Sequence, residues 1–143
     1  MKKLLYICIA ILLFSCKKED AINEIPTISF VSISPSTANE YVDDINITIS
    51  YSDGDGDLGE NNPDIFNLFI RDNRNFIEYK FRIPELTPDD SNIAIEGEFN
   101  IIINGTGITN ESTSQQVDYN VYVVDREGNK SNTITTSKIT INQ

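Results

Sequence analysis

The stretch INITISY, residues 45–51, alternates apolar and polar side chains without a break. Side chains of an extended strand point to opposite faces in turn, so the isoleucines of this stretch would lie on one face and the polar residues on the other. The same period of two recurs at residues 77–83 and 99–103, whereas no segment after Pro26 shows a convincing 3.6-residue apolar period. The sequence therefore predicts an all-β domain in which one face of each strand is buried.

Seven segments have the character of strands and are separated by clusters of turn residues. They are residues 27–34, 45–51, 65–72, 77–83, 99–103, 117–125 and 133–142. Seven short strands are typical of an antiparallel sandwich of the immunoglobulin or fibronectin III type. Tyr119 stands near the start of the sixth strand, where such folds often carry a tyrosine corner; the alternative is a core aromatic without that role. We expect one such domain over residues 26–143.

The first sixteen residues, MKKLLYICIAILLFSC, combine two lysines, a short apolar run and a serine before Cys16. This pattern is typical of a secretory signal and is too short to span a bilayer as a helix. Leu13 to Cys16 resembles the bacterial lipobox, which implies cleavage after residues 1–15 and diacylglycerol and acyl chains on Cys16. Residues 16–25 would then form the lipidated start and a tether. The alternative is an ordinary secreted protein that is cut elsewhere.

The residues after the cysteine, KKED, resemble the start of Bacteroidota lipoproteins that are exported to the outer face of the outer membrane. We therefore expect the lipoprotein at the cell surface in preference to the periplasm. Loss of Lys2 and Lys3 with the signal changes the formal charge from -11 to -13. So acidic a surface repels nucleic acid and anionic head groups. The expected partners are the membrane, through the lipid, and a protein or glycan ligand.

Enzymatic chemistry is restricted by composition. The chain contains no histidine, and its only mature cysteine is the expected lipid site. Nucleophilic sites that depend on histidine and zinc sites with His or Cys ligands are therefore excluded. No glycine loop of the phosphate-binding kind follows a strand and opens a helix. Paired carboxylates acting on a glycosidic bond remain as an alternative, but we do not expect an enzyme.

The segment SDGDGDLGENNPD, residues 52–64, carries five acids and no basic residue. Asp53, Asp55 and Asp57 alternate with glycines, so the backbone can turn and present three carboxylates to one point. Such an oxygen shell suits calcium better than magnesium. The spacing resembles the twelve-residue calcium loop of EF-hands, although Leu58 stands where that family has glycine. The resemblance implies three further ligands, which are Gly59, Asn61 and Asp64. The alternative is a solvated turn whose aspartates cap its own amides.

Strand counting places further acidic loops beside this one. If consecutive strands run antiparallel, the loops after the second, fourth and sixth strands emerge at one end of the sandwich. Besides residues 53–64, these loops carry Asp89, Asp90, Asp125, Glu127 and Asn129. Asp125 is the leading candidate for an additional calcium ligand. Glu24 and the tether should lie near the same end, because the first strand begins there.

The lipobox and the DGDGDLG loop together resemble small immunoglobulin-like lipoproteins of Bacteroidota. This resemblance implies a lipid-anchored binding or structural module of the cell envelope, with calcium stabilising the loops at one pole. The alternative is a carbohydrate-binding accessory lipoprotein, which would need an exposed aromatic platform. Phe69, Phe76 and Tyr122 are the aromatic residues whose phase points outward. A carboxylate-based glycosidase is less favoured.

Overall fold

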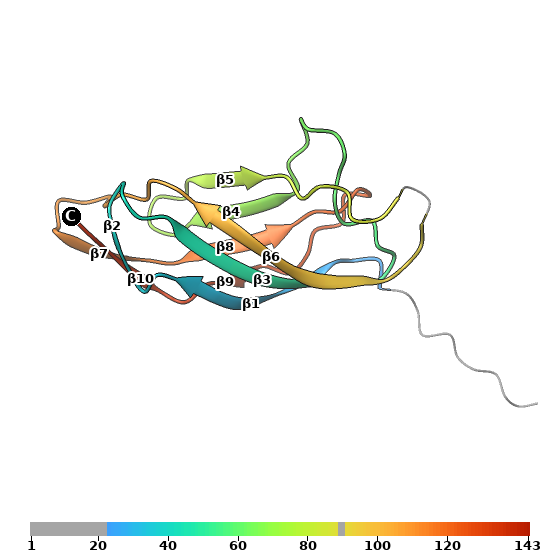
Figure 1. Cartoon of the computed structure of the whole chain (residues 1–143), viewed down its shortest axis with the longest axis horizontal. Helices are drawn as coiled ribbons and strands as arrows, with labels where there is room; N and C mark the ends of the chain where they lie inside the picture. Colours follow the sequence, from blue (N-terminus) through green and yellow to red (C-terminus); the bar gives the residue numbers. More distant parts are fainter. Residues whose placement is uncertain (1–22, 89–90) are drawn as a thin grey trace, which may run out of the picture.

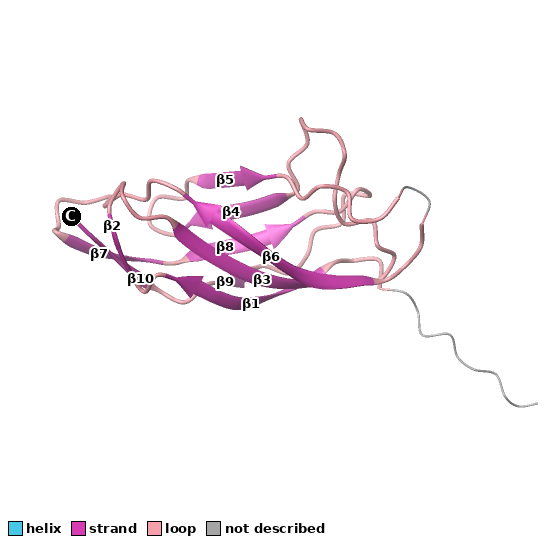
Figure 2. Ribbon diagram, viewed as in Figure 1, coloured by secondary structure: helices cyan, strands magenta, loops and turns pink. Residues whose placement is uncertain are grey.

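The computed structural model describes residues 23–88 and 91–143. Within these ranges every regular element is a β-strand (Figure 2). The ten strands are β1 (Thr27–Ser34), β2 (Thr37–Asn39), β3 (Ile45–Asp53), β4 (Leu68–Asp72), β5 (Glu78–Phe81), β6 (Ile95–Ile103), β7 (Ser114–Val117), β8 (Tyr119–Val123), β9 (Ile134–Thr135) and β10 (Ile139–Asn142). The predicted all-β class is confirmed. In the described ranges no helix has the length and apolarity needed to cross a membrane.

The strands form three hydrogen-bonded sheets, with the orders β1-β3-β6, β5-β4-β8-β9 and β2-β10-β7. Neighbours are antiparallel except β2 and β10, which are parallel. Only Asp118 separates β7 from β8, and β9 and β10 are separated by residues 136–138. Each of these two segments, predicted as one strand, thus contributes to two sheets. The short strand β2 was not predicted.

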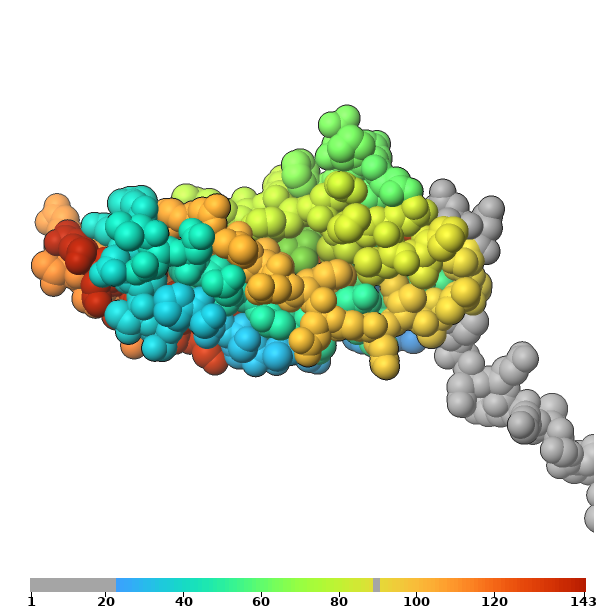
Figure 3. All heavy atoms as spheres, viewed as in Figure 1, coloured from blue at the N-terminus to red at the C-terminus, as the bar shows by residue number. Residues whose placement is uncertain are grey.

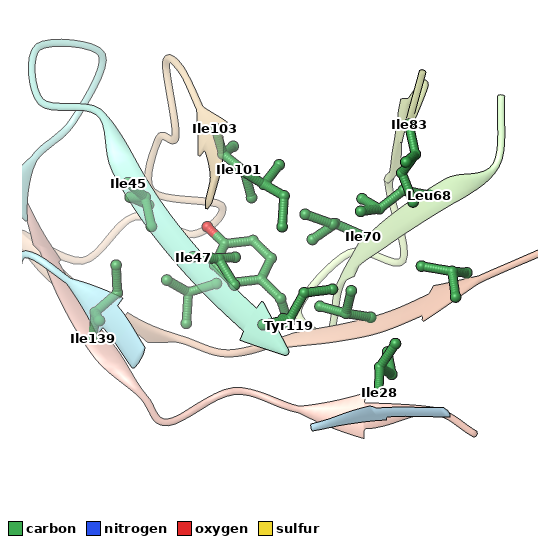
Figure 4. Packing of buried hydrophobic residues seen from close by; sticks show 14 of the residues in the cluster. Ile28, Ile45, Ile47, Leu68, Ile70, Ile83, Ile101, Ile103, Tyr119 and Ile139 are labelled. Atoms are coloured by element: carbon green, nitrogen blue, oxygen red, sulfur yellow. The ribbon is translucent and has the colours of Figure 1, made fainter. Parts of the chain in front are cut away.

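One hydrophobic cluster joins the sheets β1-β3-β6 and β5-β4-β8-β9. From the first sheet it contains Ile28, Ile45, Ile47, Ile49, Ile101 and Ile103, and from the second Leu68, Ile70, Tyr119, Val121 and Val123. The ring of Tyr119 lies among isoleucines from both sheets (Figure 4). Its hydroxyl group is 3.3 Å from Oγ1 of the buried Thr106, which is a side-chain contact and not the backbone bond that defines a tyrosine corner. The predicted alternation of β3 is confirmed, and the arrangement is compatible with a sandwich.

The loops after β3, β5 and β8 lie at one end of the molecule, together with the N-terminal end of the described chain (Figure 1). The C-terminus lies at the opposite end. We call the first end the acidic pole; its described loops are residues 54–67, 82–88 with 91–94, and 124–133. Part of the first loop projects as a knob from the surface (Figure 3), where residues 61–66 are exposed. The placement expected from strand counting is therefore confirmed for these loops.

Candidate metal centre

The acidic loop begins with the last residue of β3. Asp53 is only 1% exposed, and its Oδ2 accepts a hydrogen bond of 2.8 Å from the backbone amide of Leu58. Leu58 itself is fully buried in the hydrophobic cluster. Both ends of the turn are therefore held inside the molecule. The bond to Leu58 is a cap of the loop's own amide, as the alternative expects, while Gly54, Asp55 and Asp57 between them are half-buried.

The loop after β5 packs against this turn. The backbone amide of Ile93 donates to the carbonyl oxygen of Asp55 at 3.2 Å. The hydroxyl group of Thr87 donates to the carbonyl oxygen of Gly56. Gly56 has a φ of 78°, and a Cβ atom there would collide with the carbonyl oxygen of Ile93. Both the left-handed conformation and the close backbone approach therefore require glycine at this position.

The turn brings three carboxylates together. Asp53, Asp55 and Asp57 each offer one oxygen, and these oxygens all lie within 4.8 Å of one another. Asp53 is buried, and the other two are half-buried. This group of side chains has the donor type and spacing to hold a metal ion. The alternation of aspartate and glycine in the sequence thus produces the predicted cluster.

Asp125 carries a further buried carboxylate at the same pole, in the loop after β8, although it is not one of the three clustered aspartates. It is 7% exposed, and its Oδ1 accepts a 2.7 Å hydrogen bond from the backbone amide of Asn129. Among the described residues, the buried side-chain atoms without a hydrogen-bond partner are Asp53 Oδ1, Asp55 Oδ1, Asp57 Oδ1 and Asp125 Oδ2. Such acceptors each cost on the order of 1–3 kcal/mol when they are left unsatisfied. Their concentration in aspartates of one pole points to a cation as the missing partner.

The charges of the two loops act on one another. Burial raises the pKa of Asp53 to about 6, and the negative charges of Asp55 and Asp125 add to the increase. Burial also raises the pKa of Asp57 to about 6, and the charge of Asp125 is the next largest cause. Since Asp125 disfavours ionisation of aspartates on the other loop, the two loops share one electrostatic environment. A cation in it would relieve the repulsion.

Backbone hydrogen bonds fasten the two loops together. The amide of Glu127 donates to Asp57 Oδ2 at 3.2 Å, and the amide of Arg126 donates to the carbonyl oxygen of Asp57 at 3.4 Å. The guanidinium of Arg126 also reaches the carbonyl oxygens of Gly59, at 3.5 Å, and Thr87, at 3.4 Å. Arg126 therefore links all three loops of the acidic pole.

The remaining predicted ligands have other contacts. The carbonyl oxygen of Gly59 accepts a hydrogen bond from the guanidinium of Arg126. The side-chain amide of Asn61 donates to the carboxylate of Glu85 in an exposed position. Asp64 is exposed and does not belong to the group of three clustered aspartates. Of the ligands that the EF-hand resemblance implies, only Asp53, Asp55 and Asp57 lie in the cluster. Asp89, Asp90 and the lipidation site Cys16 lie outside the described residues.

Two of the three outward-facing aromatic residues are covered by neighbours, and the third, Phe76, is exposed. Phe69 on β4 and Tyr122 on β8 stack on each other with ring centroids 4.8 Å apart, and Nζ of Lys130 lies 3.6 Å from the centroid of Tyr122. Phe76 is 69% exposed, and the guanidinium of Arg71 lies 5.6 Å from its ring centroid. Because a sugar stacks on the face of an aromatic ring, Tyr122 is poorly placed for that role.

Comparisons with known proteins return no match, whether with family models, with curated proteins or with solved structures.

Proposed function

We propose that the protein is a lipid-anchored binding or structural module of the cell envelope that binds calcium at its acidic pole. The carrying observation is the set of four unpartnered carboxylate oxygens in two loops that are bonded to each other. Calcium takes six to eight oxygen ligands in flexible geometry, whereas magnesium demands near-ideal octahedral geometry and retains several waters. Carboxylates that converge from separate loops, with waters completing the shell, suit calcium.

The location is proposed from the N-terminal sequence. Leu13 to Cys16 resembles a lipobox, and the KKED stretch after it favours the cell surface over the periplasm. Metabolic labelling with a palmitate analogue tests the anchor. We expect label on the wild-type protein and none on Cys16→Ser; equal labelling of the two would remove the lipid from the proposal.

The immunoglobulin-like architecture is part of the same proposal. It is supported by two antiparallel sheets that share one core. Loops at the ends of such sandwiches are common binding sites, which agrees with a metal centre at the acidic pole. The carbohydrate-binding alternative has weaker support, because Phe69 stacks on the Tyr122 ring and Lys130 Nζ lies 3.6 Å from its centroid, which leaves Phe76 as the exposed ring.

Isothermal titration with calcium tests the metal centre, with two variants of the same loop and the same change of charge. Wild-type protein should bind calcium saturably. Asp55→Asn should lower the affinity by about tenfold or more, because it removes one anionic ligand. Asp64→Asn should change the affinity less than about twofold, since Asp64 is exposed and outside the cluster. No saturable binding to the wild type, or equal loss in both variants, would overturn the proposed site.

A further inference from the structure

We propose that calcium at the acidic pole fastens residues 23–24 to the domain, so that the ion controls how rigidly the domain is held by its N-terminal segment. This inference rests on the proposed calcium site and adds a regulatory role to it. Its evidence is a separate set of contacts, between the N-terminal segment and the two loops that carry the four aspartates.

The first contact joins the segment to the loop after β3. The backbone amide of Gly54 donates to the carbonyl oxygen of Asn23 at 3.1 Å. Gly54 stands between two of the clustered aspartates, Asp53 and Asp55. A Cβ atom at Gly54 would lie 2.5 Å from the carbonyl oxygen of Asn23 and 2.9 Å from its nitrogen. Glycine is therefore what allows the segment to lie directly on the backbone of the acidic turn.

The second contact joins the segment to the loop after β8. The side-chain amide of Asn129 donates to the carbonyl oxygen of Glu24 at 3.4 Å, while the backbone amide of Asn129 donates to Asp125 Oδ1 at 2.7 Å. One residue thus holds both the N-terminal segment and a carboxylate of the site. Any movement of Asp125 on binding a cation is transmitted directly to the residue that holds Glu24.

The charges explain why these contacts should depend on the ion. Without a cation, four carboxylates repel one another across the two loops. Asn23 and Glu24 are exposed and gain little from burial, so their attachment depends on the positions of Gly54 and Asn129. A calcium ion would draw the loops together and hold both attachment points in place. By linkage, docking of the segment must then strengthen calcium binding by the same factor.

The attachment also shortens the reach of the anchor. In the proposed lipoprotein, residues 17–25 would span up to ~30 Å as a free extended tether. With residues 23–24 fastened to the pole, the six residues from Lys17 to Ile22 reach only ~20 Å. Calcium would therefore keep the acidic pole closer to the membrane and restrict the orientations of the domain.

A spin label on the segment measures this coupling in the purified mature protein. Cys16→Ser with Asn23→Cys leaves one thiol, and the contacts of Asn23 described above involve only its backbone. With the four aspartates unchanged, calcium should lengthen the rotational correlation time of the label at least about twofold. Calcium affinity is measured on the same sample by titration. Saturable binding with unchanged label mobility would overturn the inference and leave the proposed site intact, whereas absence of binding would overturn both.

Two variants remove the attachment points without touching a carboxylate. Gly54→Ala introduces the collision with Asn23, and Asn129→Ala removes the bond to Glu24 but keeps the backbone amide that serves Asp125. Each should abolish the calcium response of the label and weaken calcium binding about fivefold. Gly105→Ala is the control, because nothing lies within 4 Å of a Cβ atom there. It should leave both properties unchanged. A full label response in either attachment variant would contradict the inference.

Discussion

Asp57 Oδ2 accepts a hydrogen bond from the backbone amide of Glu127 at 3.2 Å, although 70 positions separate the two residues. This bond joins the loop after β3 to the loop after β8, and it places Asp125 in the electrostatic environment of Asp53 and Asp57. The candidate metal centre is thus a product of the fold and not of one acidic stretch.

The stability of the calcium-free protein should increase as the pH falls. The folded state raises the pKa of Asp53 and Asp57 to about 6, above the ordinary 3.8, so it binds protons more tightly than the unfolded state does. The repulsion in the folded state is present at neutral pH and is lost as the pH falls through 6 toward 4. Thermal melting in EDTA should therefore give a higher melting temperature at pH 5 than at pH 7.5.

The control for this pH dependence is Asp57→Asn, which removes one of the two titrating groups. Its melting temperature should change less between pH 7.5 and pH 5 than that of the wild type. The calcium-induced increase in melting temperature should also shrink at pH 5, because protons compete with the ion. An identical pH dependence in wild type and variant would contradict the assignment of the effect to this cluster.

Replacement of Asp125 should have opposite effects with and without calcium. In EDTA, Asp125→Asn removes a negative charge that faces other carboxylates, so it should raise the free energy of unfolding by about 1 kcal/mol. In calcium it should lower the affinity by about tenfold or more. Glu127→Gln is the matched control in the same loop: its side chain is exposed and only its backbone amide contacts Asp57. A similar response of both variants in calcium titration would exclude Asp125 as a ligand.

Two glycines with positive φ should differ sharply in their tolerance of alanine. Gly56→Ala combines a φ of 78° with a collision against Ile93, whereas Gly105→Ala combines a φ of 69° with open space. The first substitution should cost roughly 2–4 kcal/mol of unfolding free energy and the second about 1 kcal/mol. Denaturant unfolding of the two variants measures the difference. Equal costs would contradict the close packing of the loop after β5 on the acidic turn.

The hydroxyl group of Tyr119 should contribute to stability more than that of Tyr122. Tyr119 is fully buried and pairs with Thr106, which is 2% exposed, so Tyr119→Phe leaves a buried hydroxyl without its partner. We expect a loss of about 1–3 kcal/mol in denaturant unfolding. Tyr122→Phe removes an exposed bond to Glu78 and should cost less than about 0.5 kcal/mol. A larger loss for Tyr122→Phe would be incompatible with the packing around Tyr119.

The strands were predictable where one face is buried and the other is at least partly exposed. Ile45, Ile47 and Ile49 are all fully buried, as their alternation indicates. Alternation did not predict that residues 117–125 and 133–142 each divide into two strands, because the division depends on pairing with strands far along the chain. Thr136, for example, lies between β9 and β10, and its hydroxyl group accepts a hydrogen bond from the backbone amide of Tyr119. The three residues of β2 are too few to show any periodicity.

The candidate site was predictable in its first three aspartates, since alternation with glycine is a local feature. The ligands expected further along the loop were not brought to it, because Leu58 is buried in the core and residues 61–66 are directed outward to solvent. Strand counting placed the loop of Asp125 beside the acidic turn, because antiparallel topology decides which loops meet at one end; the role of Asp125 as a ligand stays a prediction. The close approach of Asn23 to Gly54 depends on backbone packing that no local pattern indicates.

Thermal melting of the mature protein in millimolar calcium and in EDTA at pH 7.5 tests the central claim most directly. At a calcium concentration about 100 times the dissociation constant, binding to the folded state adds roughly 2.7 kcal/mol of stability. For a domain of this size, that corresponds to an increase in melting temperature of about 5 °C or more. We predict such an increase for the wild-type protein. Equal melting temperatures in calcium and in EDTA would contradict the calcium site.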